Sequence, residues 1–401
     1  MPQRLRRRDL LIGGGSGLVA GALQGCVTEE QRTWQARAPK PLQFVPIDAT
    51  PDRITQITVC TRPFRAQGPC LDVQKVADKA VVHNYGHGGS GWSLSWGSSD
   101  IAVNKALATN VREVAVIGCG ALGMTSALLL QRAGIKTTIY AKELPPNVRS
   151  SYATGVWTPD SRICLGQSIA PSFKLTWERM ARKSFQTYQS FLGLPGNPVE
   201  FYESYTVSND PITHIRQNPP KNGQPPFAEL ETELIPDLRP LAKEYAPGGH
   251  SLGNRYLKRT TEMMFNLAAY SRLLLADFLA NGGTIEIAEF NTLNDLVSLR
   301  QKTLINATGY GARALFEDSS VTPVRGQVAR LIPQPEINYG LYYKSAYFVP
   351  RRDGLVFQMT GEDDYYGFGD PTTVPDRTEA EAAVTTIAEL FQTPKTQNRL
   401  G

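Results

Sequence analysis

The sequence predicts a two-domain α/β protein, on three observations. Strand-like and helix-like apolar patterns alternate along most of the chain. Residues 114–140 form one sharply defined unit of strand, glycine turn, helix and strand. Residues 197–258 are rich in Pro, Tyr and Asn, which indicates part of a second, β-rich domain inserted into the first. With 401 residues, 41% hydrophobic and 20% charged, the chain is long enough to bury a sizeable core.

The charge of the chain gives no sign of a nucleic-acid surface. The formal net charge is +5, and it includes the cluster Arg4, Arg6, Arg7 and Arg8. Without that cluster the chain is nearly neutral, whereas nucleic-acid binding needs a basic face. We therefore expect no nucleic-acid partner.

The first 26 residues resemble an export signal. Arg6 and Arg7 precede an apolar, glycine-rich run at 12–23 that is too short to span a bilayer, as in a twin-arginine signal. The run ends before Cys26 in a pattern similar to a lipoprotein cleavage box, which implies a lipid anchor on Cys26 as the only membrane contact. A basic leader with an accidental cysteine is the alternative. We expect an exported, periplasmic or cell-envelope lipoprotein, with residues 27–51 as a mobile tether.

Four further cysteines, Cys60, Cys70, Cys119 and Cys164, show no CxxC pair, and no histidine stands at metal-ligand spacing. The sequence therefore predicts no metal site. An oxidising compartment would permit a disulfide between Cys60 and Cys70, and buried free thiols are the alternative that we favour.

Apolar periodicity predicts the remaining elements. Residues 54–60 alternate as a strand and precede a polar turn at 66–69. Helix patterns are expected at 98–108, 125–133, 174–192, 261–280 and 378–391, and the glycines at 282 and 283 would close the fourth.

The turn after the first strand of the 114–140 unit has the spacing of a dinucleotide site. Gly118 permits the tight turn, Gly120 lets the backbone approach a pyrophosphate, and Gly123 packs the helix on the strand. The backbone at Ala121 and Leu122 starts the helix whose N-terminus would hold the anion. The alternative is a purely structural glycine turn. For the ribose, Glu143 stands one place later than expected, and Lys142 would meet a phosphate or solvent.

Four stretches then resemble the D-amino-acid oxidase family of FAD enzymes. Residues 138–141 and 150–159 are similar to the segment that leads to the flavin ring, residues 305–312 to a glycine turn near the phosphates, and residues 323–327 with 347–350 to the entry into the substrate sheet. The most specific stretch, residues 83–93 preceded by 61–65, is similar to the family's flavin loop and arginine-bearing strand. The alternative for most of these residues is ordinary sheet packing.

The resemblance implies noncovalent FAD and a set of site residues. Arg62 stands where the family binds the substrate carboxylate, Tyr256 where a tyrosine meets it, the Gly89 carbonyl would accept from the amine, and Ser90 would act through water. His83 and His87 belong to a structural loop in the family, although a metal pair or an acid–base couple is conceivable from their spacing. The remaining expected cofactor contacts are Ser150, Ser151, Gly155, Val156, Gly309, Gly88, Gly91, Trp92 and Ser93.

The order of these stretches differs from that of the family, where the flavin loop and the arginine strand come last. We interpret this as circular permutation: a Rossmann-type FAD domain with an inserted mixed β-sheet substrate domain, whose C-terminal family segment has moved to the front. The predicted boundaries are a FAD domain at 52–195 and 259–322, substrate-domain parts at 196–258 and 323–376, and a terminal helix at 377–401 that completes the FAD domain; within 52–195, the permuted segment is 52–108 and the Rossmann unit 109–165.

The implied activity is FAD-dependent oxidative deamination of a D-amino acid, with oxygen as acceptor and a 2-oxo acid, ammonia and hydrogen peroxide as products. A related secondary-amine oxidase, a quinone-linked amino-acid dehydrogenase and a catalytically silent flavin-binding lipoprotein are the alternatives. Arg255, Lys258 and Arg259 near Tyr256 would favour acidic substrates or form a solvated strand. The sequence indicates no oligomeric state.

Overall fold

The computed structural model describes residues 40–212, 220 and 223–392, and the architecture lies within Pro41–Gly401. The expected export signal and Cys26 lie outside the described residues. No described helix has both the length and the apolar character needed to cross a bilayer.

A six-stranded sheet contains the predicted strand–helix–strand unit. Its strands are parallel except for β2, which pairs antiparallel with β3. The buried apolar residues of β4 and β5 explain their central place, because parallel strands are covered on both faces. In spatial order the strands are β2 (Val73–Val76), β3 (Lys79–His83), β10 (Thr303–Asn306), β4 (Glu113–Ile117), β5 (Lys136–Ala141) and β9 (Thr284–Ile287).

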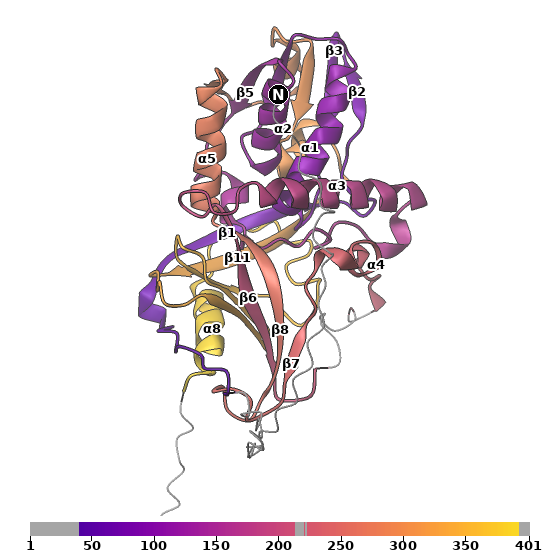
Figure 1. Cartoon of the computed structure of the whole chain (residues 1–401). Helices are drawn as coiled ribbons and strands as arrows, with labels where there is room; N and C mark the ends of the chain where they lie inside the picture. The colour runs from indigo at the N-terminus through magenta and orange to yellow at the C-terminus, as the bar shows by residue number, and fades with distance from the viewer. Residues whose placement is uncertain (1–39, 213–219, 221–222, 393–401) are drawn as a thin grey trace, which may run out of the picture. The chain divides into compact units, whose positions relative to one another are not determined.

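Helices pack closely around this sheet (Figure 1). The N-terminal part of α1 is rich in glycine and serine and nevertheless helical, so this helix begins before residue 98, where the sequence predicts it. The small side chains allow close packing: a Cβ at Gly97 would overlap the backbone of Met180 in α3. The four main helices are α1 (Gly91–Leu107), α2 (Ala121–Arg132), α3 (Pro171–Gln189) and α5 (Leu267–Ala280).

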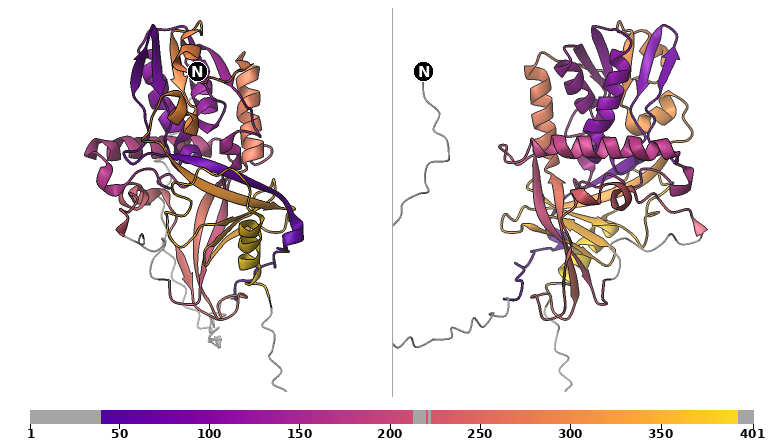
Figure 2. Two further views of the ribbon diagram at one scale, coloured as in Figure 1. Left: turned by 180° about the vertical axis from the view of Figure 1, so that it is seen from behind. Right: turned by 45° about the vertical axis from the view of Figure 1, so that its right-hand side comes forward.

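An eight-stranded sheet forms the second layer, and Figure 2 shows β1 and β11 passing beneath the helical part. β1 pairs antiparallel with β11 from Ile54 opposite Leu331 to Phe64 opposite Thr322. A strand from the start of the chain thus joins a sheet built from its second half. In spatial order the strands are β1 (Ile54–Phe64), β11 (Thr322–Leu331), β14 (Leu355–Met359), β13 (Ala346–Val349), β12 (Tyr339–Tyr343), β6 (Val199–Ser208), β8 (Tyr256–Phe265) and β7 (Lys243–Tyr245).

The structure corrects the expected helix at 261–280. Residues up to Phe265 continue β8, which pairs with β6 along its whole length, and α5 begins at Leu267. The β-branched and aromatic residues near the boundary favour a strand, a preference that the apolar periodicity concealed. The end of the helix is as predicted: Gly282 adopts a left-handed φ of +79° after Ala280.

Two expectations about the chain ends are also wrong. Helix α8 (Arg377–Ala388) packs on the eight-stranded sheet and not on the FAD domain, because its apolar face meets Leu355 and Phe357. Residues 41–51, expected to be mobile, lie on the same outer face, where the ring of Phe44 stands 4.9 Å from that of Tyr205.

Short elements complete the described chain. They connect the main strands and helices; η2, η6 and α7 carry residues of the cavity described below, and η1 precedes β1. They are η1 (Pro51–Arg53), η2 (Arg149–Tyr152), η3 (Gly166–Ser168), α4 (Leu230–Leu234), η5 (Pro236–Leu238), α6 (Leu293–Val297), η6 (Gly309–Gly311) and α7 (Ala312–Leu315).

Candidate active site

One cavity of about 510 Å³ brings together segments from distant parts of the chain. It lies where the carboxyl ends of β4, β5 and β10 meet β1 and the start of α1. Ligands of open α/β sheets bind at this edge. The lining comes from residues 60–63, 87–89, 91–92, 117–122, 140–143, 148–150, 153, 288–291, 307–311 and 314–315.

The glycine turn has the geometry of an anion-binding loop. Gly118 has a φ of +108°, and a Cβ there would stand 2.6 Å from the Ala307 oxygen. A Cβ at Gly123 would overlap the Gly118 oxygen, so this glycine permits close packing of α2 on the turn. The backbone N–H of Ala121 donates to Ser150 Oγ at 3.1 Å. Leu122, the second residue of the twelve-residue helix α2, also lines the cavity, so the positive N-terminal end of this helix borders it.

Two expected cofactor contacts border the far end of this cavity. Glu143 and Lys142 both line it, and Lys142 Nζ lies 3.2 Å from Glu289 Oε1. Lys142 is therefore paired with a neighbouring carboxylate. Glu143 follows the end of β5, where a carboxylate that binds the ribose hydroxyls is expected. Gly309 lines the opposite wall with open space around its Cβ position.

The loop at 86–91 is clamped between two other segments. The N–H of Gly88 donates to Pro63 O at 2.8 Å, and the N–H of Gly89 donates to Ser161 O at 2.9 Å. A Cβ at Gly88 would overlap the carbonyl oxygen of Arg162. Glycine is thus required where β1 and the 161–162 segment converge. Gly89, Gly91 and Trp92 then line the cavity at the N-terminus of α1.

His87 is fully buried beside the same loop. Ser98 Oγ donates to Asn84 Oδ1 at 2.6 Å, so the 2.7 Å contact between Ser98 and His87 Nε2 requires the ring to carry its proton on Nε2. Burial lowers the pKa of His87 to about 3. The ring is therefore neutral, and its Nδ1 is a buried acceptor without a hydrogen-bond partner in the described chain.

Arg62 lines the cavity next to this loop. Its Nη1 donates to Arg325 O at 3.1 Å, and a Cβ at Gly326 would overlap the guanidinium, which lies flat over that glycine. No carboxylate lies within 4 Å of Arg62 in the part of the chain that the structure describes. Arg162 stands close to Arg62 but outside the lining, and it is paired with Asp364, whose Oδ1 lies 3.8 Å from Arg162 Nη2. Its burial and the proximity of Arg62 lower the pKa of Arg162 to about 10.

Several expected site residues lie elsewhere. Tyr256 begins β8, nine residues from Phe265, and does not line the cavity, because the extended strand carries it to the far end of the sheet. Ser90 is buried and donates to Ser161 O at 3.1 Å, and Ser93 Oγ accepts from Thr158 N at 2.8 Å, so both hydroxyls hold the loop in place. Ser151 is buried outside the lining, where its Oγ has no hydrogen-bond partner in the described chain.

Gly155 and Val156 border the site without lining the cavity. Gly155 O accepts from Phe265 N at 2.7 Å, and Val156 forms a bridge with Met264. Gly155 has a φ of +88°, and a Cβ there would stand 2.7 Å from Phe265 O. The segment is thereby fixed against β8, and the cavity lining in this part of the chain ends at Ala153.

The structure also assembles a group that the sequence did not reveal. On the face of the sheet that meets Val156, the hydroxyls of Tyr202 and Tyr347 both donate to Glu262 Oε2 at 2.7 Å, and they lie 2.6 Å from each other. Burial raises the pKa of both phenols well above its ordinary value. The three residues come from β6, β8 and β13, so no local motif signals them.

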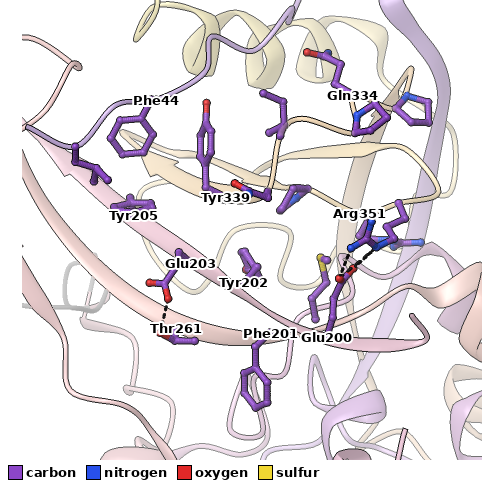
Figure 3. Close-up of a pocket in the computed structure, with 18 of the residues that line it drawn as sticks. Phe44, Glu200, Phe201, Tyr202, Glu203, Tyr205, Thr261, Gln334, Tyr339 and Arg351 are labelled. Atoms are coloured by element: carbon purple, nitrogen blue, oxygen red, sulfur yellow. Dashed lines mark hydrogen bonds and ion pairs between the residues drawn. The ribbon is translucent and has the colours of Figure 1, made fainter. Parts of the chain in front are cut away.

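A second cavity, of about 620 Å³, opens beside β6 (Figure 3). Its charged groups are largely paired: Arg352 Nη2 lies 2.7 Å from Glu200 Oε2, and Glu203 accepts from Thr261 at 3.0 Å. Aromatic rings of Phe44, Tyr205 and Tyr339 form one wall.

The first cavity fits FAD. The glycine turn and the N-terminus of α2 suit a pyrophosphate, and Glu143 suits a ribose hydroxyl. Gly91 and Gly309 leave open space where a side chain would intrude. The unpartnered Nδ1 of His87 adds a buried acceptor at the other end, beside the N-terminus of α1.

The chain is similar to known flavin enzymes. The family model described as FAD dependent oxidoreductase matches residues 113–399. D-amino-acid oxidase from Rubrobacter xylanophilus is 27% identical over 284 residues, covering 70% of this chain and 77% of that protein. D-amino-acid oxidase from Streptomyces coelicolor is 28% identical over 289 residues, covering 69% and 77%. A solved structure of L-amino acid deaminase from Proteus vulgaris has a TM-score of 0.46 at 13% identity, covering 69% and 73%.

The family match spans well over half of the chain. The glycine turn at 118–123 lies inside the matched residues and borders a cavity that fits FAD. The chain therefore belongs to the FAD-dependent oxidoreductase family that includes the D-amino-acid oxidases.

Proposed function

We propose that this enzyme oxidises D-amino acids to imino acids, which hydrolyse to 2-oxo acids and ammonia, with oxygen as the electron acceptor and hydrogen peroxide as its product. The observation that carries the proposal is Arg62, a guanidinium with no carboxylate partner within 4 Å in the described chain, at the cavity beside the Gly89 loop. The names of the relatives from Rubrobacter xylanophilus and Streptomyces coelicolor support the D configuration.

The residues around the cavity divide the work of substrate binding. Arg62 offers a planar fork that grips a carboxylate with two hydrogen bonds. The carbonyl of Gly89 is an acceptor for the amine in its neutral form, in which the lone pair can assist the loss of hydride from Cα. FAD, when bound, supplies the hydride acceptor. The N-terminus of α1 at Gly91 directs positive potential into the same end of the cavity, where it stabilises negative charge.

A panel of D- and L-amino acids tests the proposal. Anaerobic loss of the flavin absorbance scores the oxidation of each amino acid, and oxygen consumption with peroxide formation scores the acceptor. D-amino acids should bleach the flavin, and the L-enantiomers should not. Bleaching without oxygen consumption would assign a different acceptor, such as a quinone, and bleaching only by N-alkylated substrates would assign a secondary-amine oxidase.

We also propose that the chain is a circular permutation of the family order. Two observations support it: the family model begins at residue 113, after the flavin loop and arginine strand, and β1 completes the sheet that β11 and β14 build. The permutation predicts that the strand at 54–62 joins the substrate sheet beside the strand around 347–350. The structure instead places β11 next to β1, and β13 (Ala346–Val349) two strands beyond β11. Arg377 of α8 donates to Pro51 O at 2.9 Å, so the last described helix adjoins the start of β1.

A rearranged chain tests this order. It would begin near residue 110, continue through α8, and join residue 391 to Arg53 through a short linker, ending after α1. Because the rearranged chain can form the same contacts as the natural chain, we expect its FAD content and activity to be close to those of the natural chain. A rearranged chain that folds poorly with every linker length would contradict the proposal.

Export and lipidation of Cys26 are further proposals, supported by the arginine pair and the cleavage-like sequence. Fatty-acid labelling of the full-length protein should depend on Cys26, and Cys26→Ala should abolish it. Replacement of both Arg6 and Arg7 by Lys should retain the protein in the cytoplasm. Export that persists without the arginine pair would oppose the twin-arginine route.

A further inference from the structure

We propose that Glu379 of α8 is a positioning residue for substrate binding: through Arg325 it holds the guanidinium of Arg62 in the orientation that receives the substrate carboxylate. The inference rests on the proposed function, because it takes Arg62 as the carboxylate site.

The guanidinium of Arg62 has a fixed place on β11. Its Nη1 donates to the carbonyl oxygen of Arg325 at 3.1 Å. A Cβ at Gly326 would stand 2.4 Å from Nη2 and 2.5 Å from Cζ, so the guanidinium lies against the backbone of this glycine. Because Arg62 is opposite Val324 in the β1–β11 ladder, its side chain runs along β11 to reach these contacts.

These contacts leave one edge of the guanidinium for a ligand. Nε and Nη2 of Arg62 share that edge, and neither has a hydrogen bond to the described chain. Two parallel N–H donors on one edge match the two oxygens of a carboxylate. The Arg325 carbonyl holds the remaining nitrogen, so it sets the plane and the direction in which Arg62 presents its free edge.

The side chain of Arg325 is anchored on the other face of the sheet. Successive residues of a strand point to opposite faces, so this side chain projects away from Arg62, toward α8 (Figure 1). Its Nη1 donates to Glu379 Oε2 at 2.6 Å, and both side chains are only 10% exposed. Its Nη2 donates to Gln327 Oε1 at 3.0 Å, and Asp370 Oδ2 lies 3.9 Å from its Nε.

Glu379 is the strongest of these anchors. Its contact with Arg325 is short, charge-assisted and shielded from water, whereas Asp370 is 40% exposed and lies farther away. Glu379 stands in the first turn of α8, which packs on β11. Removal of one charge of a shielded ion pair leaves the other uncompensated, so Arg325 would move toward other partners. Its carbonyl would move with it, and Arg62 would lose its fixed orientation.

Binding of a carboxylate and of its uncharged amide tests the inference directly. The FAD-loaded enzyme is titrated with hexanoate and with hexanamide, and the flavin absorbance change gives each Kd. Glu379→Gln keeps the size of the side chain but removes its charge. We expect it to weaken hexanoate binding about threefold to thirtyfold, as for a residue that acts through its neighbours, and to change hexanamide binding less than about twofold. Unchanged hexanoate binding, equal losses for both ligands, or no binding of hexanoate by the natural enzyme would overturn the inference.

Steady-state kinetics should show the same division. For a D-amino acid, Glu379→Gln should raise KM by about the factor found for hexanoate, with kcat and FAD content nearly unchanged, because the substitution disturbs the hold on the carboxylate. A lower kcat at an unchanged KM would overturn the inference.

An Arg62→Lys background tests whether the effect passes through Arg62. An ammonium is a compact charge on a flexible stem, so it cannot reproduce the planar contact with Arg325 and Gly326. Adding Glu379→Gln should therefore change hexanoate binding little in this background, because both substitutions remove the same contact. An equal loss in the two backgrounds would overturn the inference.

Two variants of α8 are matched controls. Glu381→Gln removes the same charge from the same helix, but Glu381 is exposed and pairs with Arg377 at 2.6 Å. Val384→Ala loosens the buried face of α8 and leaves Glu379 in place. Both should leave the ratio of the hexanoate and hexanamide Kd values unchanged, and a changed ratio in either would overturn the inference. If Glu379→Gln fails to bind FAD, Glu379→Asp, which keeps the charge at a shorter reach, decides by the same ratio.

Failure of the positioning role and failure of the proposed function give different results. Turnover of D-amino acids, with the same Kd ratio in Glu379→Gln and the natural enzyme, would leave the oxidase proposal standing and refute the positioning role. No turnover of any D-amino acid, together with hexanoate binding that Glu379→Gln weakens, would refute the oxidase proposal and retain the positioned carboxylate site.

Discussion

Gly88→Ala tests whether the loop at 86–91 is clamped as the structure shows. Gly88 has a φ of +55°, and an alanine Cβ there would overlap Arg162 O and stand 2.8 Å from the Arg162 carbonyl carbon. The left-handed conformation costs an L-residue about 1–2 kcal/mol. Displacing backbone in a packed site adds about 1–3 kcal/mol. The total expected loss of unfolding free energy is therefore about 2–5 kcal/mol.

Gly193→Ala is the matched control, since Gly193 has a φ of +72° and open space around its Cβ position. It should lose only the conformational part, about 1–2 kcal/mol. Urea unfolding of both FAD-loaded variants measures the difference, and FAD titration should show weaker binding only for Gly88→Ala. Equal losses in the two variants would refute the close approach of Gly88 to the 161–162 segment, and with it the position assigned to the Gly89 carbonyl.

Four further outcomes are expected. Arg62→Ala should lower kcat/KM for D-amino acids by about 3–5 kcal/mol of transition-state stabilisation, roughly a hundredfold to several thousandfold, with FAD content retained; an unchanged kcat/KM would move the carboxylate site. Tyr256→Phe should change kcat/KM less than twofold, and a larger loss in steady-state assays would return this residue to the site. Because Cys60 and Cys70 are free thiols, dithiothreitol should leave the Tm unchanged, and a lowered Tm would indicate a disulfide. Burial lowers the pKa of His83 to about 4 and of His87 to about 3, so below pH 6.5 these histidines bind protons in the unfolded chain but not in the folded chain. Each histidine should therefore lower the free energy of unfolding by about 2 kcal/mol at pH 5 relative to neutral pH, as measured by urea unfolding. A His87→Gln variant with the same pH dependence as the natural protein would contradict this.

The sequence correctly predicted those parts of the fold that depend on the conformational preferences of neighbouring residues. Three glycines between an apolar strand and a helix predicted the phosphate turn, because only residues without a Cβ allow that backbone path. The free state of Cys60 and Cys70 was the favoured prediction, and both are buried thiols. The end of α5 was predicted correctly because glycine at a helix terminus has a specific conformational role.

Predictions failed where long-range packing decides. The residues at 261–265 carry an apolar pattern that suits a helix, but pairing with β6 makes them a strand. Phe44 lies in a polar segment that the sequence predicted to be a tether. Its ring packs against the rings of Tyr205 and Tyr339, and these contacts can be seen only in the tertiary structure. Tyr256 was assigned by its distance along the chain from a family pattern, while strand geometry carries it away from the cavity.

The sequence by itself indicated the cofactor class through short motifs that resemble those of FAD enzymes, and the same motifs predicted the roles that we propose for Arg62 and the glycine loop. Such motifs can be recognised because their residue types have specific backbone and hydrogen-bonding roles. Only the tertiary structure decided that Arg62, Gly89 and the phosphate turn border one cavity, since they stand on segments separated in the chain. It alone assembled Tyr202, Glu262 and Tyr347, because β-sheet pairing joins strands irrespective of their sequence separation.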